Sequence, residues 1–417
     1  MSHFTFTEFC KKYPLRDKII LCRIDADVPL NDYGLISDDM RLKDALPTIN
    51  AVLEKGGLPV IIGHMGRPDG KRNENLSLDK VAERFEEYIK EGKLHAEEVY
   101  FEPTTIGEAA KKAVNTHKLE NVVVVLENVR FSPNEEAKDP LARRAFAGEI
   151  AKLGDYFIDD AFAVMHRSQA SITGITEFLP SCIGLYAEKE IKGIRPFLAP
   201  EKGSAALIGG AKLDKIALLS KVMKNYDNVL IGGAIAFTFM FAKGMNIGTS
   251  LLDKERLDEV KKLLRDYDKK IFLPSDIVVA VTNPADIKMH RFEKMETVDA
   301  DEIEARMMGL DIGPQSVKTF LTHSSKAKMV FWNGPMGLVE VSPFDKATVD
   351  IAKGLSKMGN KRLVGGGDSN KVVNKLKLSG SFSHVSAGGG ACLEFMGSGK
   401  LAGLDALERN HMIYSRK

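Results

Sequence analysis

The chain has 417 residues, of which 44% are hydrophobic and 28% are charged, and its formal net charge is only +2. The length exceeds one ordinary core and predicts about two or three domains. The near-zero charge disfavours a general nucleic-acid binder with a strongly basic surface. The four cysteines lack CxxC spacing, so neither a zinc site nor a disulfide framework is expected. We find no secretory signal and no apolar run of about 18 residues, so we expect a cytoplasmic protein.

Short apolar runs rich in Val and Ile alternate along the chain with amphipathic stretches of about 10–15 residues. The runs cover residues 18–25, 58–64, 121–129, 156–162, 204–210, 228–233, 270–276, 328–334, 362–368 and 383–390. Runs that are apolar throughout are typical of parallel strands buried on both faces, with helices as the crossovers. The sequence therefore predicts an α/β fold with two parallel sheets.

In the first half of the chain, charged and imidazole side chains follow the predicted strands. They are Arg23, Asp25, His64, Arg67, Arg130, His166 and Arg167, with Arg41 in a nearby segment. Ligands of open parallel sheets bind beyond the carboxyl ends of the strands, and arginine is suited to bidentate capture of carboxylate and phosphate. This half is therefore predicted to bind a small anion.

In the second half, glycines follow the predicted strands, at 209–215, 232–237, 333–337, 365–368 and 387–391. Glycine turns before helices bring backbone N–H groups up to phosphates, and Lys212 and Lys215 stand at one such turn. This half is therefore predicted to bind nucleotide phosphates. The boundary between the halves is expected at about 180–195. The sequence contains neither a GxxxxGK[ST] loop nor a GxGxxG dinucleotide fingerprint.

Each of these motifs has a structural alternative. The turn that carries His64 and Arg67 could simply expose solvated charges. Arg130 ends an apolar run and needs either a ligand or a carboxylate, for which Glu127 or Asp160 would serve. Asp368, directly after three glycines, either caps the next helix or holds a magnesium ion. Trp332 is expected to pack in the core, leaving function to Asn333 and Glu340.

Taken in order, these stretches resemble the phosphoglycerate kinase family. The motifs are RIDADVP, GHMGRPDG, LENVRF, DDAFAVMHR, GGAKLDK, GGAIAFTF, MGLDIGP, WNGPMG, GGGDS and SHVSAGGGA, and they span essentially the whole chain. The resemblance implies two doubly wound parallel-sheet domains, joined by a hinge and facing each other across a cleft. Residues 1–185 would bind the triose, residues 186–400 the nucleotide, and residues 401–417 would pack back on the first domain.

The resemblance also implies roles for individual residues. The triose site, for 3-phosphoglycerate or 1,3-bisphosphoglycerate, would comprise Asp25, Asp27, Arg41, His64, Arg67, Arg130 and Arg167. The site for ATP or ADP would comprise Gly210, Lys212, Lys215, Gly232, Gly233, Leu251, Gly309, Leu310, Asn333, Pro335, Glu340, Gly367, Asp368 and Ser369. Asp368 would hold Mg2+. Arg41, Lys212 and Gly389 would act on the transferred phosphoryl group, with Gly388 and Gly390 as further backbone donors.

The sequence departs from the family pattern at several positions. Asp27 stands where Asn is usual, Asp159 precedes Asp160 where Asn-Asp is usual, Ala163-Val164 replaces Gly-Thr, and Ala387 replaces Thr. GGAKLDK is one residue shorter than the usual GGAKVxDK. A carboxylate at position 27 would repel an anionic substrate, so we expect it to pair with Arg41 or Arg167. The alternatives are that Asp27 is protonated or that it accepts a hydrogen bond from the substrate hydroxyl.

The predicted reaction is reversible in-line phosphoryl transfer between 1,3-bisphosphoglycerate and ADP, in a monomer whose domains close over the substrates. Such transfer needs positioning and charge neutralisation but no covalent enzyme intermediate. We consider two rival functions. An NAD-dependent dehydrogenase is disfavoured by the missing GxGxxG fingerprint. An inert phosphometabolite sensor should have lost Arg41, Lys212 or Asp368, and all three are present.

Overall fold

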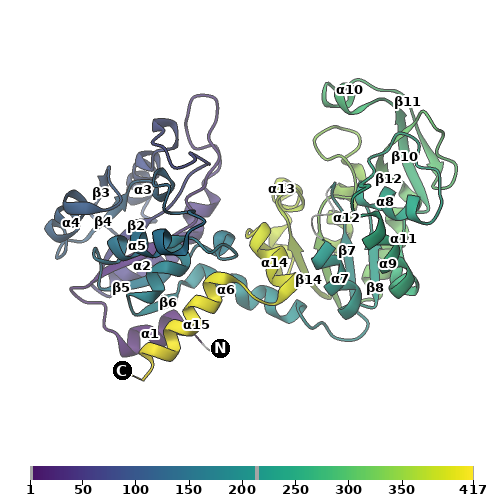
Figure 1. Cartoon of the computed structure of the whole chain (residues 1–417). Coiled ribbons are helices and arrows are strands. Elements are labelled where there is room, and N and C mark those ends of the chain that lie inside the picture. Colours follow the sequence, from purple (N-terminus) through teal and green to yellow (C-terminus); the bar gives the residue numbers. More distant parts are fainter. Residues whose placement is uncertain (1–2, 212–215, 417) are drawn as a thin grey trace. The chain divides into compact units, whose positions relative to one another are not determined.

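The computed structural model describes residues 3–211 and 216–416. The chain divides into two compact units, unit 1 (Met1–Ile191 with Lys400–Lys417) and unit 2 (Lys192–Gly399). The first division falls inside helix α6 (Leu185–Ile194), and the second falls directly after Gly399. Each unit contains a six-stranded sheet in which all strand pairs are parallel, and this confirms the predicted α/β fold with two parallel-sheet domains (Figure 1).

The sheet of unit 1 has the strand order β3-β4-β2-β1-β5-β6. Its strands are β1 (Ile19–Arg23), β2 (Leu58–Ile62), β3 (Glu98–Glu102), β4 (Val122–Leu126), β5 (Tyr156–Asp159) and β6 (Ser181–Ile183). Strands β1, β2 and β4 are buried at every residue, as their continuous apolar runs predict. Their carboxyl ends therefore lie side by side in the interior of the sheet.

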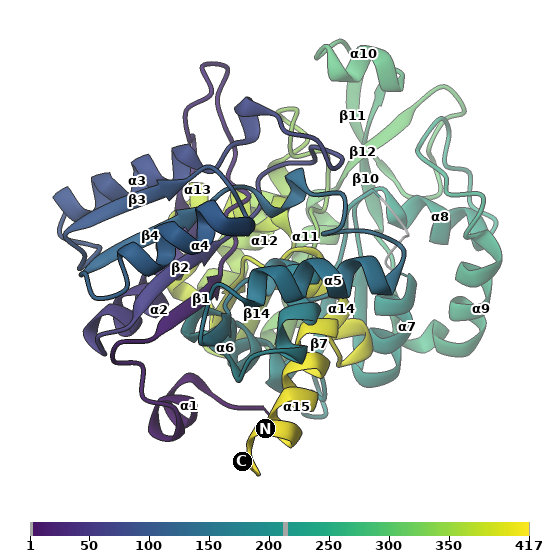
Figure 2. The ribbon, with the colours of Figure 1, turned by 60° about the vertical axis from the view of Figure 1, so that its left-hand side comes forward.

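Helices cover both faces of this sheet (Figure 2). They are α1 (Phe6–Lys12), α2 (Met40–Glu54), α3 (Asp79–Lys90), α4 (Gly107–Thr116), α5 (Pro140–Ala151) and α15 (Ala402–Tyr414). Ile49 of α2 and Phe85 of α3 share one core cluster with Ile20, whereas Phe146 of α5 shares the other cluster with Leu21. The alternation along β1 follows from the two-residue period of a strand.

The C-terminal helix α15 packs within unit 1. Asn410 accepts a hydrogen bond from Ser181 N at 3.0 Å and donates to Thr176 O at 2.6 Å and Leu179 O at 2.7 Å. Near the end of the helix, the Tyr13 hydroxyl donates to Tyr414 O at 2.8 Å. The chain thus leaves unit 2 after Gly399, and its last segment belongs to unit 1.

The main sheet of unit 2 has the strand order β15-β14-β13-β7-β8-β9. Its strands are β7 (Ala205–Ile208), β8 (Asn228–Ile231), β9 (Ile271–Phe272), β13 (Met329–Asn333), β14 (Lys361–Gly365) and β15 (His384–Ser386). The helices beside it are α7 (Ile216–Asn225), α8 (Ile235–Ala242), α9 (Leu257–Tyr267), α11 (Pro314–Lys326), α12 (Lys346–Ser356), α13 (Gly367–Lys375) and α14 (Gly390–Ser398). Trp332 is fully buried in this core, as predicted, and donates from Nε1 to Gly334 O at 2.9 Å.

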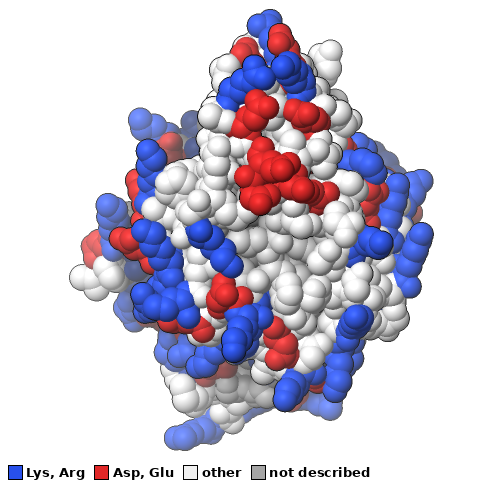
Figure 3. Space-filling view, turned by 90° about the vertical axis from the view of Figure 1, so that its right-hand side faces the viewer, with Lys and Arg blue, Asp and Glu red and all other residues white. Residues whose placement is uncertain are grey.

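Unit 2 also contains a small antiparallel sheet, β11-β10-β12, which the sequence analysis did not predict. It consists of β10 (Asp276–Val281), β11 (Glu293–Asp299) and β12 (Met308–Ile312), with α10 (Pro284–Lys288) between the first two. The face of unit 2 in Figure 3 shows separate basic groups, one acidic patch and a wide uncharged area, and no continuous basic surface. Among the helices that the structure describes, none combines the length and apolar character needed to cross a membrane.

Candidate active site

The predicted triose residues of unit 1 gather at the carboxyl ends of four strands that are neighbours in the sheet. In open parallel sheets this edge is the place where ligands bind. Asp25 and Asp27 follow β1, His64 and Arg67 follow β2, Arg130 follows β4, and Arg167 follows β5. The fold therefore brings to one sheet edge residues that are up to 142 positions apart, from Asp25 to Arg167 (167 − 25).

Arg41, in the first turn of α2, points back at the loop after β1. Its Nη1 lies 3.2 Å from Asp25 Oδ1 and donates to the backbone oxygen of Asp27 at 2.8 Å. The Asp25 side chain is only 4% exposed. Burial raises the pKa of Asp25, and the positive charge of Arg41 opposes that shift. Asp25 thus holds the Arg41 guanidinium at the edge of the site.

Asp27 makes its short hydrogen bond to backbone rather than to arginine. Its Oδ1 accepts from Gly66 N at 2.8 Å, while its Oδ2 lies 3.9 Å from both Arg41 Nη1 and His64 Nε2. The predicted pairing with Arg41 is therefore present only as a long contact. Arg167, the other predicted partner, forms its ion pair with Glu136 instead.

Arg130 and Arg167 share one carboxylate, Glu136. Its Oε1 lies 3.0 Å from Arg130 Nη2 and 3.5 Å from Arg167 Nη1. Arg130 is 4% exposed and also donates from Nη1 to Gly66 O at 2.8 Å. The expectation that Glu127 or Asp160 would pair with Arg130 is wrong. Glu127 instead accepts hydrogen bonds from the segment before α3 and lies 3.3 Å from Arg72.

His64 and Arg67 differ in environment although both follow β2. His64 is buried, so for this residue the alternative of a solvated turn is wrong. Burial lowers the pKa of His64 well below its usual value, and the charges of Arg23, Arg130, Arg167 and Arg41 lower it further. Arg67 is exposed and, within the described part of the chain, has no ion pair. Its guanidinium is therefore available to an anion from solution.

Unit 2 carries a cavity of about 650 Å³ at the carboxyl ends of β7, β8 and β13. Most of the predicted nucleotide residues line it, namely Gly210, Gly233, Leu251, Gly309, Leu310, Pro335, Glu340 and Asp368. The side chains of Phe237, Ile287 and Met336 form part of the apolar wall of this cavity. A largely apolar cavity with a few polar groups at its edge has the size and character of a cofactor or nucleotide site.

Glycine is required where the strand-end loops of this cavity touch. Gly233 has φ +62°, and a Cβ there would lie 2.5 Å from Gly210 N. Gly334 has φ +87°, and its Cβ would lie 2.2 Å from Gly209 O. Side chains rarely adopt this backbone conformation and could not fit between the loops. The close approach is fixed by backbone hydrogen bonds, from Gly210 N to Pro335 O at 2.8 Å for example.

Two predicted nucleotide residues, Gly232 and Asn333, lie behind the cavity wall. Asn333 is fully buried and donates from Nδ2 to Gly365 O at 2.8 Å. Gly232 N donates to Ile208 O at 2.9 Å and continues the ladder between β7 and β8. Both residues therefore support the lining loops from behind.

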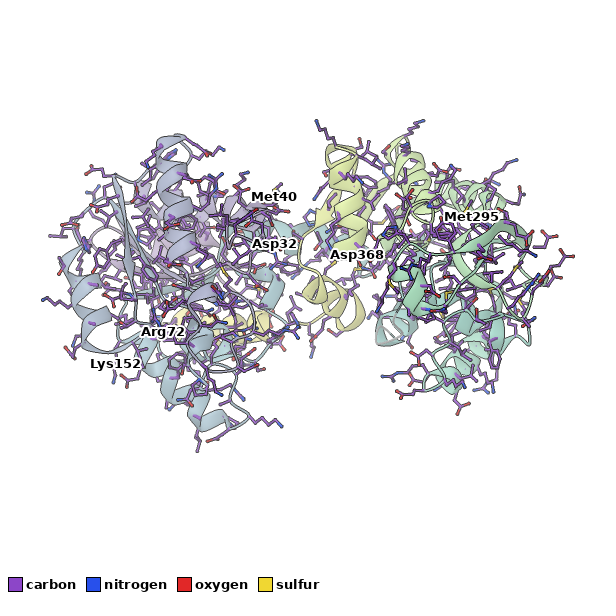
Figure 4. The ribbon with its side chains drawn as sticks, turned by 90° about the horizontal axis from the view of Figure 1, so that it is seen from above. Asp32, Met40, Arg72, Lys152, Met295 and Asp368 are labelled. Carbon is purple, nitrogen blue, oxygen red and sulfur yellow. The ribbon has the colours of Figure 1, made fainter. Side chains whose placement is uncertain are left out.

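Asp368 lies in the first turn of α13 (Figure 4). The N-cap of this helix is Gly366, so the alternative that Asp368 is the cap is wrong. The Asp368 side chain is 48% exposed, lines the cavity, and lies 3.2 Å from Lys371 Nζ. Beside it, Gly367 opens the helix, and Ser369 is fully buried with an Oγ that has no hydrogen-bond partner among the described residues. A carboxylate and an unpaired hydroxyl at a helix N-terminus fit a metal-bound phosphate.

A cage of protein ligands for a metal is absent from residues 3–211 and 216–416, where no three His, Cys, Asp or Glu residues group suitably. A single carboxylate still fits magnesium, because this ion usually keeps several waters and binds substrate phosphates as well as one or two carboxylates. Gly389 is the N-cap of α14, next to Gly388 and Gly390 at the carboxyl end of β15. Lys212 and Lys215 lie outside the described residues.

Several residues of both sites were missed by the sequence analysis. In unit 1 these are Glu135, Glu136 and Ser171, and in unit 2 they include Phe237 and Ile287. The signal for the two glutamates was present, because they follow Arg130 closely in NVRFSPNEEA and a buried arginine needs a carboxylate. The two apolar residues carry no signal that separates them from ordinary core positions.

The chain matches the family model "Phosphoglycerate kinase" over residues 10–400. It is 41% identical over 404 residues to the phosphoglycerate kinase of Bifidobacterium longum, covering 94% of this chain and 98% of that protein. Identity to the phosphoglycerate kinase of Chloroflexus aurantiacus is 40% over 399 residues, covering 94% and 96%. Among solved structures, phosphoglycerate kinase from Coxiella burnetii superposes with a TM-score of 0.83 at 28% identity, covering 99% of this chain and 100% of that one. With its two parallel-sheet domains and these relatives, the chain belongs to the phosphoglycerate kinase family.

Proposed function

We propose that the chain transfers a phosphoryl group reversibly between 1,3-bisphosphoglycerate and ADP, giving 3-phosphoglycerate and ATP. Membership of the family supports a kinase of glycolysis. The observation that carries the proposal for this chain is the contrast between its two strand-end sites. One gathers arginines around a buried histidine, and the other is a glycine-rich cavity bordered by Asp368.

The triose would bind at the arginine site of unit 1. Arg67 is exposed and unpaired among the described residues, and Arg130 and Arg167 share the single carboxylate of Glu136. The three positive charges of these arginines are therefore balanced in part by one negative charge, that of Glu136. A ligand that carries both a carboxylate and a phosphate would complete this balance, because arginine binds both groups through paired hydrogen bonds.

The nucleotide would bind in the cavity of unit 2. Its apolar wall suits the faces of a purine and ribose, and Glu340 at the wall can accept a hydrogen bond from a ribose hydroxyl. The N-termini of α13 and α14 follow β14 and β15, and the positive end of a helix dipole favours phosphates. Magnesium would be held by Asp368 together with phosphate oxygens, and it would supply neutralisation of phosphate charge.

Transfer would proceed in line, without a covalent enzyme intermediate, since such reactions need positioning and stabilisation of charge on the equatorial oxygens. Arg41 would supply positive charge from unit 1, held in place by Asp25 at 3.2 Å. Lys212 and Gly389 are proposed for the same charge on the basis of the sequence. The substrates would have to meet during the reaction, and we propose that closure of the two domains brings them together. A cytoplasmic monomer remains a prediction from the sequence.

The proposal is tested by a coupled assay with 3-phosphoglycerate and MgATP, in which 1,3-bisphosphoglycerate formation is followed through an added dehydrogenase. Turnover that depends on both substrates and on magnesium is expected. The rival function, an inert phosphometabolite sensor, predicts 3-phosphoglycerate binding by calorimetry without turnover. That outcome would refute the proposed function.

A further inference from the structure

We propose that Arg23 fixes His64 as the neutral tautomer with its proton on Nε2, so that His64 presents a hydrogen-bond donor to the bound triose. Arg23 is then a positioning residue that acts through His64. The inference about the tautomer stands on the geometry of unit 1, and only the identity of the ligand rests on the proposed function.

Arg23 is the last residue of β1 and is completely buried. Its Nη2 lies 2.9 Å from His64 Nδ1, its Nε donates to Ser171 Oγ at 3.0 Å, and its Nη1 donates to the backbone oxygen of Ile24. Each of its three nitrogens thus has a partner, and the guanidinium plane has one orientation. A buried arginine held at all three nitrogens has little freedom to rearrange when a ligand binds.

The direction of the Arg23–His64 hydrogen bond follows from the chemistry of arginine. A guanidinium has five N–H donors and no acceptor, and it stays protonated in proteins. His64 Nδ1 must therefore accept, and a ring nitrogen that accepts carries no proton. Since a neutral imidazole has one N–H, the proton is on Nε2.

The other side of Arg23 ends on a buried carboxylate. Ser171 Oγ accepts from Arg23 and donates to Glu135 Oε1 at 2.6 Å, while Ser171 N donates to Glu135 Oε2 at 3.0 Å. Glu135 is fully buried, and burial raises its pKa to about 7, while the positive charge of Arg23 opposes this shift. Because a guanidinium only donates, the hydrogen bonds from Arg23 to Ser171 Oγ and to His64 Nδ1 keep their direction whether or not Glu135 is protonated, and the remaining donor of the ring is at His64 Nε2.

The surroundings of His64 keep the ring neutral. The nearby charged groups are Arg23 and Asp27 from the end of β1, Arg41 from α2, Arg130 after β4, and Arg167 after β5. Burial and these four arginines lower the pKa of His64, whereas the one carboxylate that lies near Nε2 among the described residues is Asp27, whose Oδ2 is 3.9 Å away. His64 accordingly contributes a directional donor to the site, and the arginines contribute the positive charge.

The ligand atom that meets His64 Nε2 must therefore be a hydrogen-bond acceptor, such as a carboxylate or phosphate oxygen. A ligand with a donor at that position would leave two N–H or O–H groups facing each other. The arrangement thus selects for an oxygen acceptor at one defined point, in addition to the non-directional attraction of the arginines.

Nitrogen NMR of the full chain labelled with 15N-histidine tests the tautomer directly. The His64 signals are assigned by their loss in His64→Asn. We expect a pyridine-type shift for Nδ1 and a pyrrole-type shift for Nε2, unchanged between about pH 6 and 8. Imidazolium shifts in that range, or a proton on Nδ1, would overturn the proposal without any further variant.

A double variant, Arg23→Met with Glu135→Gln, tests whether Arg23 is the cause while avoiding an unpaired buried charge. We expect the two tautomers to mix and to give averaged His64 shifts. The KM for 3-phosphoglycerate should rise about tenfold, because the hydrogen bond from His64 Nε2 to an oxygen of this anion is weakened. The matched control, Glu135→Gln alone, retains Arg23 and should keep the Nε2–H tautomer. A pure Nε2–H tautomer in the double variant would show that Arg23 does not fix it. Because these shifts are read without substrate, a failure of the proposed function in the coupled assay is a separate result.

Discussion

The site of unit 1 is built from charged side chains, whereas the cavity of unit 2 is built mainly from backbone and apolar side chains. In unit 1, buried or half-buried groups hold one another, as Asp25 holds Arg41 at 3.2 Å and Glu136 holds Arg130 at 3.0 Å. In unit 2, the loops after β7, β8 and β13 touch through glycines. The first design is sensitive to the charge of a side chain, and the second to the addition of a single carbon atom.

The difference follows from what each site is proposed to bind. A small triose anion offers only its charged ends, so recognition requires several cations, and these must be balanced by carboxylates in the free protein. A nucleotide offers a large ring system and phosphates, which an apolar cavity and helix N-termini can bind with few charges. We expect the two sites to fail in different ways, and the following variants are ordered by the size of the expected effect.

Asp368→Ala should have the largest effect, because Asp368 is the carboxylate proposed to hold magnesium at the edge of the cavity. Loss of one such electrostatic group typically lowers turnover by about 10²–10³-fold. The coupled assay should show this loss in kcat, while calorimetry shows unchanged 3-phosphoglycerate affinity. Asp258→Ala is the matched control, since Asp258 also lies in the first turn of an α-helix of unit 2 but does not line the cavity. Near-normal turnover and magnesium dependence in Asp368→Ala would remove the residue from the site.

Gly233→Ala should break the cavity without changing any charge. The new Cβ would lie 2.5 Å from Gly210 N at φ +62°, and a side chain in left-handed backbone costs about 1–2 kcal/mol before the clash is counted. We expect the Kd for MgADP to rise at least about tenfold. Gly359→Ala is the control, because a Cβ there meets nothing within 4 Å and its φ is ordinary. Equal nucleotide affinity in the two variants would contradict the account of the cavity.

Glu136→Gln should strengthen anion binding in unit 1, because it leaves the positive charges of Arg130 and Arg167 without their shared carboxylate. The substitution removes the carboxylate that Arg130 and Arg167 share in the free protein. Partly exposed ion pairs are worth up to about 1 kcal/mol, so 3-phosphoglycerate should bind roughly two- to fivefold more tightly. Weaker binding, measured by calorimetry, would show instead that Glu136 is needed to position the two arginines.

Asp27→Asn should have the smallest effect. The amide oxygen of Asn can accept the hydrogen bond that Asp27 Oδ1 receives from Gly66 N at 2.8 Å. The variant loses only the long contact of 3.9 Å with Arg41 and the repulsion between the carboxylate and an anionic substrate. We expect an active enzyme with equal or tighter 3-phosphoglycerate affinity, within about twofold. A large rise in the KM for 3-phosphoglycerate would mean that the negative charge itself is required.

The sequence predicted the interior of the fold better than its edges. Every predicted apolar run contains a strand, because strands covered on both faces are apolar throughout. The strands that were missed are β3 and β6, the two edges of the sheet in unit 1, and all three strands of the small sheet, including its central strand β10, whose apolar residues 277–281 were overlooked. β3 is partly exposed and begins and ends with glutamate, β6 has only three residues, and β11 is mostly exposed. Such segments lack the continuous apolar signal.

The site could be predicted only as far as the types of side chain at strand ends. The arginines of unit 1 were identified, but the sharing of Glu136 by Arg130 and Arg167 depends on how loops after β4 and β5 meet. In the same way, the glycines of unit 2 were identified, but Gly232 and Asn333 could not be separated from the lining residues beside them. Which side of a loop faces a cavity is decided by tertiary packing and not by sequence spacing.

The central claim is that triose and nucleotide are recognised separately, by side-chain charge in unit 1 and by the glycine-rich cavity in unit 2. Calorimetric titration of Arg67→Ala with 3-phosphoglycerate and then with MgADP tests it most directly, because Arg67 is exposed and unpaired among the described residues, so its truncation should not disturb the fold. A hydrogen-bonded ion pair to a ligand is worth about 1.5–3 kcal/mol, so the Kd for 3-phosphoglycerate should rise at least about tenfold. The Kd for MgADP should not change. Unchanged 3-phosphoglycerate affinity, or an equal loss for both ligands, would contradict the account.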